Sequence, residues 1–349
     1  MVAAFSRLVV PLDTPPMEAR LVDAIPSDEG WQYEPKWDGI RCLAFRDGDD
    51  VALMSKSGKP LARYFPEVAE LLRRCRSDRF VVDGELILPL GDSLSFDALQ
   101  VRLHPAASRI ERLARETPAQ LMLFDCLQSG AKVLMGQPLT NRRAALEALM
   151  AEPPAGLLLS PATRDCEVAD DWLARSGGAL DGIIAKRLDG TYQRGERAMA
   201  KRKLRRSADC VLGGFRYDTA GRIVASLLLG LYDEAGLLHH VGYTSALSAE
   251  ARAALTPELE ALKGPSAFTG SAPGGPSRWS SGRSSEWQPL RAERVVEVGY
   301  DQVTGGRFRH GTTFVRWRPD KMPSQCTCDQ LAAELRPEQL EQVLGIRPS

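Results

Sequence analysis

One lysine of the sequence lies in a setting that could make it a nucleophile. Lys36 belongs to the segment EPKWDGIR, residues 34–41, two positions before Asp38. Side chains two residues apart share a face of a β-strand, so we expect one strand that places Lys36 and Asp38 together, with Gly39 allowing a close turn. A lysine attacks only as the neutral amine, so its pKa must fall from about 10.4 through burial or nearby cations such as Arg41. The alternative for this pattern alone is an exposed strand lysine beside a turn.

Two further groups of residues could take part in phosphate chemistry. Residues 186–206 contain nine basic residues and two acidic ones, interleaved with Tyr192 and Met199. Such a run is usually a solvated face, but it follows a strand-like stretch, and a wall that faces phosphate groups is an equally good interpretation. Glu85 lies in a strand-like stretch between apolar residues, which favours a functional carboxylate over a surface glutamate.

These residues need a scaffold large enough for more than one core. The chain has 349 residues, 44% of them hydrophobic, which predicts two domains. Its 45 basic and 45 acidic residues give zero net charge, which argues against a general nucleic-acid binder and leaves only local basic regions.

The cysteines and the N-terminus indicate the compartment. Seven cysteines are scattered singly, unlike a disulfide framework, and indicate a reducing environment. Cys326 and Cys328 form a C-x-C pair without a second ligand pair nearby, so ordinary thiols are preferred over a metal site. The N-terminal segment has neither a membrane span nor a cleavable signal, and we expect a soluble cytoplasmic protein without membrane association.

The first part of the chain predicts an α+β domain with antiparallel sheets. Residues 31–46 and 51–55 alternate apolar and polar residues around the turn DGDD and predict a hairpin. Helical spacing predicts helices at 65–75, 109–116 and 141–150, and apolar runs predict strands at 80–90 and 121–127. We expect this domain to span residues 1–205.

The second part, residues 206–349, predicts a small β-barrel. Short β-rich runs occur at 210–217, 222–232, 237–243, 294–301 and 312–318, separated by turn residues. Five such strands suggest an OB-fold. The Gly/Pro/Ser-rich residues 264–285 predict a mobile loop within it.

A series of segments, in this order, resembles the motifs of the covalent lysyl-nucleotidyltransferase superfamily, which comprises ATP-dependent DNA ligases, RNA ligases and mRNA capping enzymes. Residues 34–41 resemble motif I, 55–58 motif Ia, 83–85 motif III, 123–125 motif IIIa, 181–186 motif IV, 201–203 motif V and 316–321 motif VI. Single motifs occur by chance, but this ordered set spans almost the whole chain. The sequence is therefore identified as similar to an ATP-dependent DNA ligase.

The resemblance implies roles for individual residues. Lys36 would attack the α-phosphorus of ATP and carry AMP, and the other implied catalytic residues are Asp38, Lys201 and Lys203. The implied ATP-binding residues are Glu34, Arg41, Glu85, Phe124, Lys186, Arg318 and Lys321. The implied ligands for Mg²⁺ or Mn²⁺ are Glu85 and Asp181, and the implied DNA-binding residues are Ser55 and Lys56. Phe124 would stack on adenine, although a core phenylalanine is the alternative.

Three positions depart from the family pattern. Asp181 stands where the family commonly has Glu, which shortens the carboxylate, and Lys56 replaces an Arg, which loses the bidentate fork. Met199 stands where the family typically has Trp. Strict alternation would also put Asp181 and Lys186 on opposite faces, so we expect the strand to bend, bulge or end there.

Within the superfamily, the sequence is most similar to the short bacterial ATP-dependent ligases used in repair. That resemblance implies nicked double-stranded DNA as the substrate, a monomer, and the end-bridging protein Ku as a partner. A capping-type guanylyltransferase and an RNA ligase are the alternatives within the superfamily. A non-catalytic OB-fold module that binds DNA is the alternative outside enzymes.

Overall fold

The computed structural model describes residues 4–90, 93–104, 106–175, 180–203, 206–220, 223–274, 286–301, 303–309, 311–331, 341 and 344–345. The chain divides into two compact units. The first comprises Met1–Lys203 with Ala333–Ser349, and the second comprises Leu204–Ala332. Each unit is described by itself.

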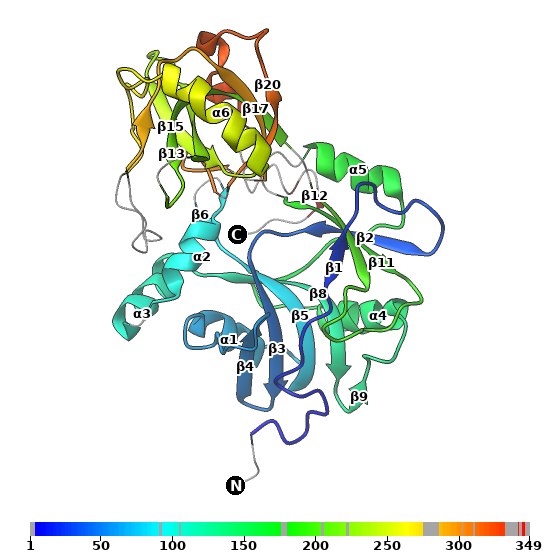
Figure 1. The fold of residues 1–349 in the computed structure, drawn as a ribbon. Helices are drawn as coiled ribbons and strands as arrows, with labels where there is room; N and C mark the ends of the chain where they lie inside the picture. Colours follow the sequence, from blue (N-terminus) through cyan, green and yellow to red (C-terminus); the bar gives the residue numbers. More distant parts are fainter. Residues whose placement is uncertain are drawn as a thin grey trace. The chain divides into compact units, whose positions relative to one another are not determined.

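A four-stranded sheet in the first unit carries most of the basic chemistry. Its strands, in the order β1-β12-β11-β2, are Ala19–Leu21, Met199–Lys203, Gly182–Arg187 and Trp31–Lys36. β11 is antiparallel to both of its neighbours, whereas β1 is parallel to β12. Strands from the start and the end of the unit therefore lie side by side (Figure 1).

A second, six-stranded sheet has the order β10-β8-β5-β3-β4, with β9 paired to β8. These strands are Leu157–Leu159, Gln120–Ser129, Arg79–Ile87, Ile40–Asp47, Asp50–Ser55 and Lys132–Val133. β3 and β4 form the predicted hairpin, in which Asp47 pairs with Asp50. Gly48 in the turn has φ +65°, a conformation that favours glycine.

Helices accompany the six-stranded sheet in the first unit. They are α1 (Pro66–Arg73), α2 (Phe96–Arg102), α3 (Ala107–Glu116), α4 (Leu139–Leu149) and α5 (Cys166–Arg175). Two short strands, β6 (Pro89–Leu90) and β7 (Ser93–Leu94), pair with each other. α1 starts at Pro66, where the fixed φ of proline suits the first helical turn. Its apolar residues at helical spacing, Val68 and Leu72, are buried.

The six-stranded sheet is buried on both faces, which fixes the side to which its polar residues point. Neighbours along a strand point to opposite faces, so Cys42 joins an apolar cluster with Val68 of α1, and Leu43 joins a cluster with Met199 of β12. The second cluster packs the two sheets against each other. Arg41 lies two residues before Leu43 and therefore faces the four-stranded sheet.

The second unit contains a six-stranded antiparallel sheet in the order β15-β14-β13-β17-β20, with β16 paired to β13. In that order, the first five strands are Leu238–Thr244, Val224–Tyr232, Arg206–Tyr217, Val295–Tyr300 and Thr313–Trp317. The smaller elements are α6 (Ala249–Ala261), β16 (Gln288–Pro289), β18 (Val303–Thr304), β19 (Arg307–Phe308), η1 (Pro323–Gln325) and η2 (Cys328–Gln330). A bridge between Thr244 and Thr312 connects the two outer strands, as in a closed barrel.

One local expectation is wrong. Residues 34–41 do not form one strand, because β2 ends at Lys36 in one sheet and β3 begins at Ile40 in the other. Tyr192 and Met199, from the basic run 186–206, are buried and belong to one apolar cluster. The predicted mobile loop falls partly on residues 275–285, which lie outside the described residues.

Two further findings complete the fold. Asp181 directly precedes β11, which begins at Gly182. The end of the strand therefore lies between Asp181 and Lys186, as expected from the alternation of side chains. Among the described residues, no helix is long and apolar enough to cross a membrane.

Candidate active site

Lys36 lies at the end of a row of residues that crosses three strands. It is in register with Gly182 of β11, which in turn is in register with Lys203 of β12. The Lys36 ammonium pairs with a carboxylate oxygen of the buried Asp181, and the same oxygen lies 3.6 Å from Lys203 Nζ. Gly182 has φ +151°, and a Cβ there would overlap the carbonyl oxygen of Arg202. Only glycine therefore allows the close strand approach that brings both lysines to one carboxylate.

The next row places a second set of polar groups on the same face. Glu34, Ile184 and Lys201 are in register across β2, β11 and β12. Since each residue is two positions from a member of the first row, both rows point to one side of the sheet. That is the side on which the six-stranded sheet packs.

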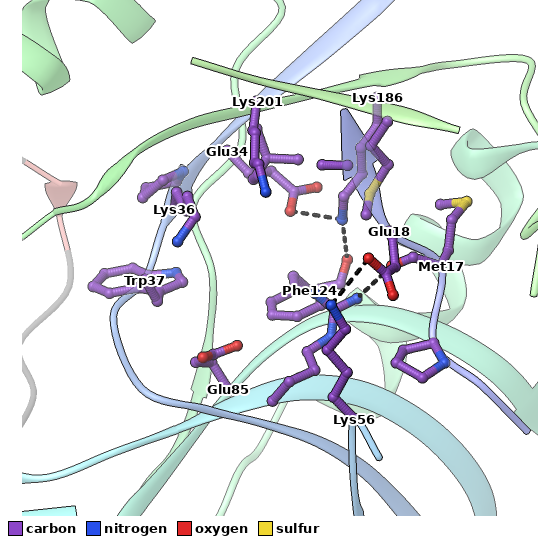
Figure 2. A pocket seen from close by; sticks show the side chains of 16 residues that line it. Met17, Glu18, Glu34, Lys36, Trp37, Lys56, Glu85, Phe124, Lys186 and Lys201 are labelled. Carbon is purple, nitrogen blue, oxygen red and sulfur yellow. Dashed lines mark hydrogen bonds and ion pairs between the residues drawn. The ribbon is translucent and has the colours of Figure 1, made fainter. Parts of the chain in front are cut away.

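A cavity of about 230 Å³ lies in the first unit, with walls from both sheets. Figure 2 shows Lys36, Lys186, Lys201, Glu85 and Phe124 arranged around it. Its lining residues are Pro16, Met17, Glu18, Ala19, Glu34, Pro35, Lys36, Trp37, Arg41, Lys56, Glu85, Phe124, Ile184, Lys186, Met199 and Lys201. Cavities of this type, with apolar walls and a few convergent polar groups, are typical small-ligand sites.

Lys186 connects the two walls of the cavity. Its ammonium pairs with Glu34 at 2.7 Å and donates to the Phe124 carbonyl oxygen at 3.3 Å. Lys186 is 4% exposed, and a buried charge needs such a partner. Gln32 donates to the other oxygen of Glu34 at 2.8 Å, so the carboxylate is held from two sides. Lys186 Nζ also lies 4.8 Å from the centre of the Phe124 ring. The dashed lines in Figure 2 mark the contacts of Lys186 with Glu34 and with the Phe124 carbonyl oxygen.

Arg41 approaches the same ring from the six-stranded sheet. Its guanidinium carbon lies 4.5 Å from the Phe124 ring centre, within the range of a cation–π contact. Two of its nitrogens donate to Asp83, at 2.6 and 2.7 Å, in the bidentate geometry typical of a strong pair. The tyrosine hydroxyl of Tyr192 donates to the same carboxylate at 2.6 Å. The ring of Phe124 is therefore in cation–π contact with both Arg41 and Lys186.

Burial and charge shift the protonation of two cavity residues. Burial raises the pKa of Glu85 to about 7, although Arg41 and Lys36 favour its charged form. Burial lowers the pKa of Lys201, and repulsion from Lys36 and Lys203 lowers it further. Residues in a cavity whose pKa is shifted by burial and by neighbouring charges are candidates for a functional role.

The carboxylates fit a divalent cation only in part. Glu85 faces the cavity, and the burial that raises its pKa to about 7 disfavours its charged form, which a bound cation would stabilise. Asp181 is already held by Lys36 and Lys203. No cluster of three or more His, Cys, Asp or Glu residues suitable for a metal occurs in the part of the chain that the structure describes. Mg²⁺ commonly uses one or two carboxylates with phosphate oxygens and water, so Glu85 beside a bound nucleotide satisfies its chemistry.

Of the two residues predicted to bind DNA, Lys56 lines the same cavity, and Ser55 precedes it in the chain. Ser55 ends β4, and its hydroxyl accepts from the Lys59 backbone N–H at 3.0 Å. Lys56 lines the cavity, and its ammonium pairs with Glu18 at 2.9 Å while its side chain stays 59% exposed. Lys56, which the sequence predicts to bind DNA, is thus one of the residues around the cavity.

Arg318 and Lys321 belong to the second unit, where both contact one carboxylate. Arg318 lies 2.9 Å and Lys321 2.7 Å from the oxygens of Asp209, and Arg318 also pairs with Asp320 at 2.8 Å. All residues that line the cavity belong to the first unit. The two cations therefore form a cluster of their own within their unit.

The structure gathers the predicted residues Lys36, Glu34, Arg41, Glu85, Phe124, Lys186, Lys201 and Lys56 around one cavity, with Asp181 and Lys203 beside Lys36. Asp38 lies beyond the end of β2 and does not line the cavity. Sequence reasoning missed Met17 and Glu18, which line it, and assigned no role to Ile184, which also lines it, or to Tyr192, which holds Asp83. No local pattern marked them, because their partners lie far away in the sequence.

Comparison with known proteins agrees with this geometry. A family model described as ATP dependent DNA ligase domain matches residues 16–203, and one described as ATP dependent DNA ligase C terminal region matches residues 220–321. The chain is 45% identical over 335 residues to DNA ligase C1 of Mycolicibacterium smegmatis, covering 92% of this chain and 95% of that protein. It is 42% identical over 350 residues to DNA ligase C of Mycobacterium tuberculosis, covering 95% and 97%.

A solved structure of a Lig E DNA ligase shares the fold. Its TM-score is 0.52 at 16% sequence identity, with 87% of this chain and 99% of that chain covered. Together with the matches to both units, this similarity confirms the predicted fold class, an α+β domain with antiparallel sheets followed by a C-terminal OB-fold domain.

Proposed function

This chain belongs to the ATP-dependent DNA ligase family, and on that basis we propose that it seals nicks in double-stranded DNA by joining a 5′-phosphate to a 3′-hydroxyl. The observation that carries the proposal is the position of Lys36 at the edge of the cavity, in contact with Asp181 and beside Lys203. We propose that the adenylation domain is residues 1–205 and the OB-fold domain residues 206–349.

In the first step, the Lys36 amine attacks the α-phosphorus of ATP. A nitrogen–phosphorus bond forms, the bond to pyrophosphate breaks, and AMP stays on Lys36. The ammonium must lose a proton before the attack, and Asp181 is an adjacent acceptor. Lys201 and Lys203 lie on the same face of the sheet and would neutralise the charge that grows on the phosphate. Asp38 keeps its proposed catalytic role.

The rest of the cavity would bind the nucleotide. Phe124 offers a flat surface on which adenine can stack. The proposed ATP-binding residues are Glu34, Arg41, Glu85, Phe124 and Lys186 in the first unit, and Arg318 and Lys321, which would orient pyrophosphate, in the second. Glu85 and Asp181 are the residues that would hold Mg²⁺ or Mn²⁺, and the bound ion would supply further charge neutralisation.

The two later steps act on DNA. AMP moves from Lys36 to the 5′-phosphate of the nick, and the 3′-hydroxyl then displaces AMP to form the phosphodiester bond. Lys56, which lines the cavity, and the preceding Ser55, at the end of β4, are the proposed contacts to the DNA backbone. The resemblance to bacterial repair ligases supports a role in DNA repair in the cytoplasm, as a monomer, with Ku as a candidate partner.

The test follows the AMP from ATP to DNA. The purified protein is incubated with a divalent metal and with ATP or GTP labelled at the α-phosphate. One portion is analysed by denaturing electrophoresis. Nicked duplex is added to a second, native portion, and the label on the DNA is then measured. We expect a label from ATP that disappears in Lys36→Ala and moves to DNA. Lys132→Ala, in β9 and outside the cavity, is the matched control and should label normally.

Each alternative gives a different result. A label only from GTP would contradict the ligase proposal and identify a capping-type guanylyltransferase. A label from ATP that moves to nicked RNA but not to nicked DNA would identify an RNA ligase. Absence of any label would contradict the catalytic proposal and favour a DNA-binding module.

A further inference from the structure

Tyr192 is a buried residue between β11 and β12 that lies outside the cavity. Its hydroxyl donates to Asp83 Oδ2 at 2.6 Å and accepts from the Met17 backbone N–H at 3.0 Å. Met17 itself lines the cavity, so the hydroxyl joins a wall of the cavity to the core of the six-stranded sheet.

The contact of Tyr192 with Asp83 continues to the aromatic surface of the cavity. Asp83 is fully buried and receives two hydrogen bonds from Arg41, whose guanidinium lies over Phe124. Arg41 also donates to the Met17 carbonyl oxygen at 3.4 Å. Hydroxyl, carboxylate and guanidinium thus form one chain that ends at the ring.

The ring of Tyr192 touches a second buried pair beside Phe124. Arg142 lies 5.8 Å from the tyrosine ring centre, and its guanidinium donates to Asp125 at 2.7 and 3.1 Å. Asp125 follows Phe124 in β8. Tyr192 therefore contacts the Arg41–Asp83 pair, which reaches the ring of Phe124, and the Arg142–Asp125 pair, which includes the next residue of β8.

We propose that Tyr192 is a positioning residue for the purine base, because its hydroxyl fixes the Asp83 carboxylate, which in turn holds Arg41 against Phe124. The inference rests on the proposed function, since it assigns the platform of Phe124 and Arg41 to the adenine of ATP. It predicts an effect on nucleotide affinity and not on the chemical step, because Tyr192 touches none of the reacting groups.

The chemistry of Tyr192 suits a permanent donor. Burial and the neighbouring Asp83 raise the pKa of the Tyr192 hydroxyl well above its ordinary value, so it keeps its proton at any working pH. Without this donor, Asp83 would be held by Arg41 alone, and the carboxylate and guanidinium could turn together away from the ring. The ring of phenylalanine would keep the packing, so Tyr192→Phe removes only the hydroxyl.

The test measures the rate of Lys36 labelling against ATP concentration. In Tyr192→Phe, the ATP concentration for half-maximal rate should rise about threefold to tenfold, as expected for one lost hydrogen bond, while the maximal rate stays within about twofold. The matched control is Tyr33→Phe, which removes another buried hydroxyl bond of the same unit, from Tyr33 to the Pro26 carbonyl oxygen at 2.7 Å. It should leave the ATP dependence unchanged.

A mutant cycle separates positioning from a general loss of stability. If Tyr192 acts through Arg41, Tyr192→Phe should add little to the effect of Arg41→Ala on the ATP dependence. If Tyr192→Phe does not fold, Asp83→Asn tests the same link, because the amide cannot accept both Arg41 bonds; the same rise is expected there.

An unchanged ATP dependence in Tyr192→Phe, or in Asp83→Asn if the first variant fails to fold, would overturn the inference. Full additivity with Arg41→Ala would do the same. These outcomes differ from failure of the proposed function, in which the unaltered protein itself would take no label from ATP.

Discussion

At the residue scale, four of the five cations that line the cavity are each paired with a carboxylate. Lys36 pairs with Asp181, Lys186 with Glu34, Arg41 with Asp83 and Lys56 with Glu18. These pairs explain how so many positive groups can lie close together in a protein of zero net charge. They also imply an exchange on ATP binding, since phosphate oxygens must replace carboxylate oxygens at some of the lysines.

One glycine sets the path of the chain next to the nucleophile. Gly39 connects β2 to β3, and a Cβ at this position would overlap the carbonyl oxygen of Leu86 in β5. Leu86 is part of a central strand and cannot move independently. The connection between the two sheets, and with it the position of Lys36, therefore requires glycine.

Gly39→Ala should displace Lys36 and lower its rate of labelling by ATP by more than about tenfold, because small displacements of reacting groups are costly. Labelling is measured under single-turnover conditions. Gly136→Ala is the matched control, since a Cβ there meets no atom within 4 Å, and it should label normally. Equal labelling of the two variants would show that the close approach does not position Lys36.

At the element scale, periodicity predicted much of what forms. The hairpin β3–β4, helices α1, α3 and α4 and the five barrel strands all occur close to their expected ranges. These elements have alternation or helical spacing, which is the main sequence signal for secondary structure.

Other elements could not be predicted because local signals opposed them or were weak. α6 runs through Pro257, which removes a helical hydrogen bond and hides the pattern, although Ser248 caps its start by accepting from the Ala251 N–H. β1 is only three residues long and pairs with β12, about 180 residues later. The end of β2 at Lys36 depends on the change from one sheet to the other, which no local pattern encodes.

His240, in β15 of the second unit, should make the stability of that unit depend on pH. Its Nδ1 lies 3.0 Å from Arg307, its ring packs edge-on against Phe268, and its buried Nε2 has no hydrogen-bond partner among the described residues. Burial, together with repulsion from Arg307 and Arg216, lowers the pKa of His240 to about 4. The neutral ring is therefore the form that the fold requires.

Because the folded pKa of His240 lies below the ordinary value of about 6.5, the unfolded chain binds its proton first as the pH falls. The stability of the second unit should then be complete above pH 6.5 and decrease toward pH 4, by on the order of 3 kcal/mol. An NMR titration of the four histidines, with His240→Gln to assign the signal, measures the pKa directly. A His240 signal that titrates near pH 6.5 would contradict the account.

At the scale of the whole molecule, charge and fold divide the proposed work between two units. The first unit alone contains the cavity, the nucleophile and the aromatic surface, and the second contains a barrel with a separate cluster around Asp209. Net neutrality means that attraction to DNA comes from local basic regions and not from the overall charge. The account therefore assigns covalent chemistry to the first unit and to one lysine within it.

The most direct test of this central claim is to locate the AMP on the chain. The protein has nine lysines, and three besides Lys36 line the cavity: Lys56, Lys186 and Lys201. After incubation with ATP and a divalent metal, proteolysis and mass spectrometry under conditions that preserve the phosphoramide bond should find the AMP mass on the peptide that contains Lys36, and on that residue alone. AMP on Lys201 or on another lysine, with Lys36 unmodified, would contradict the account.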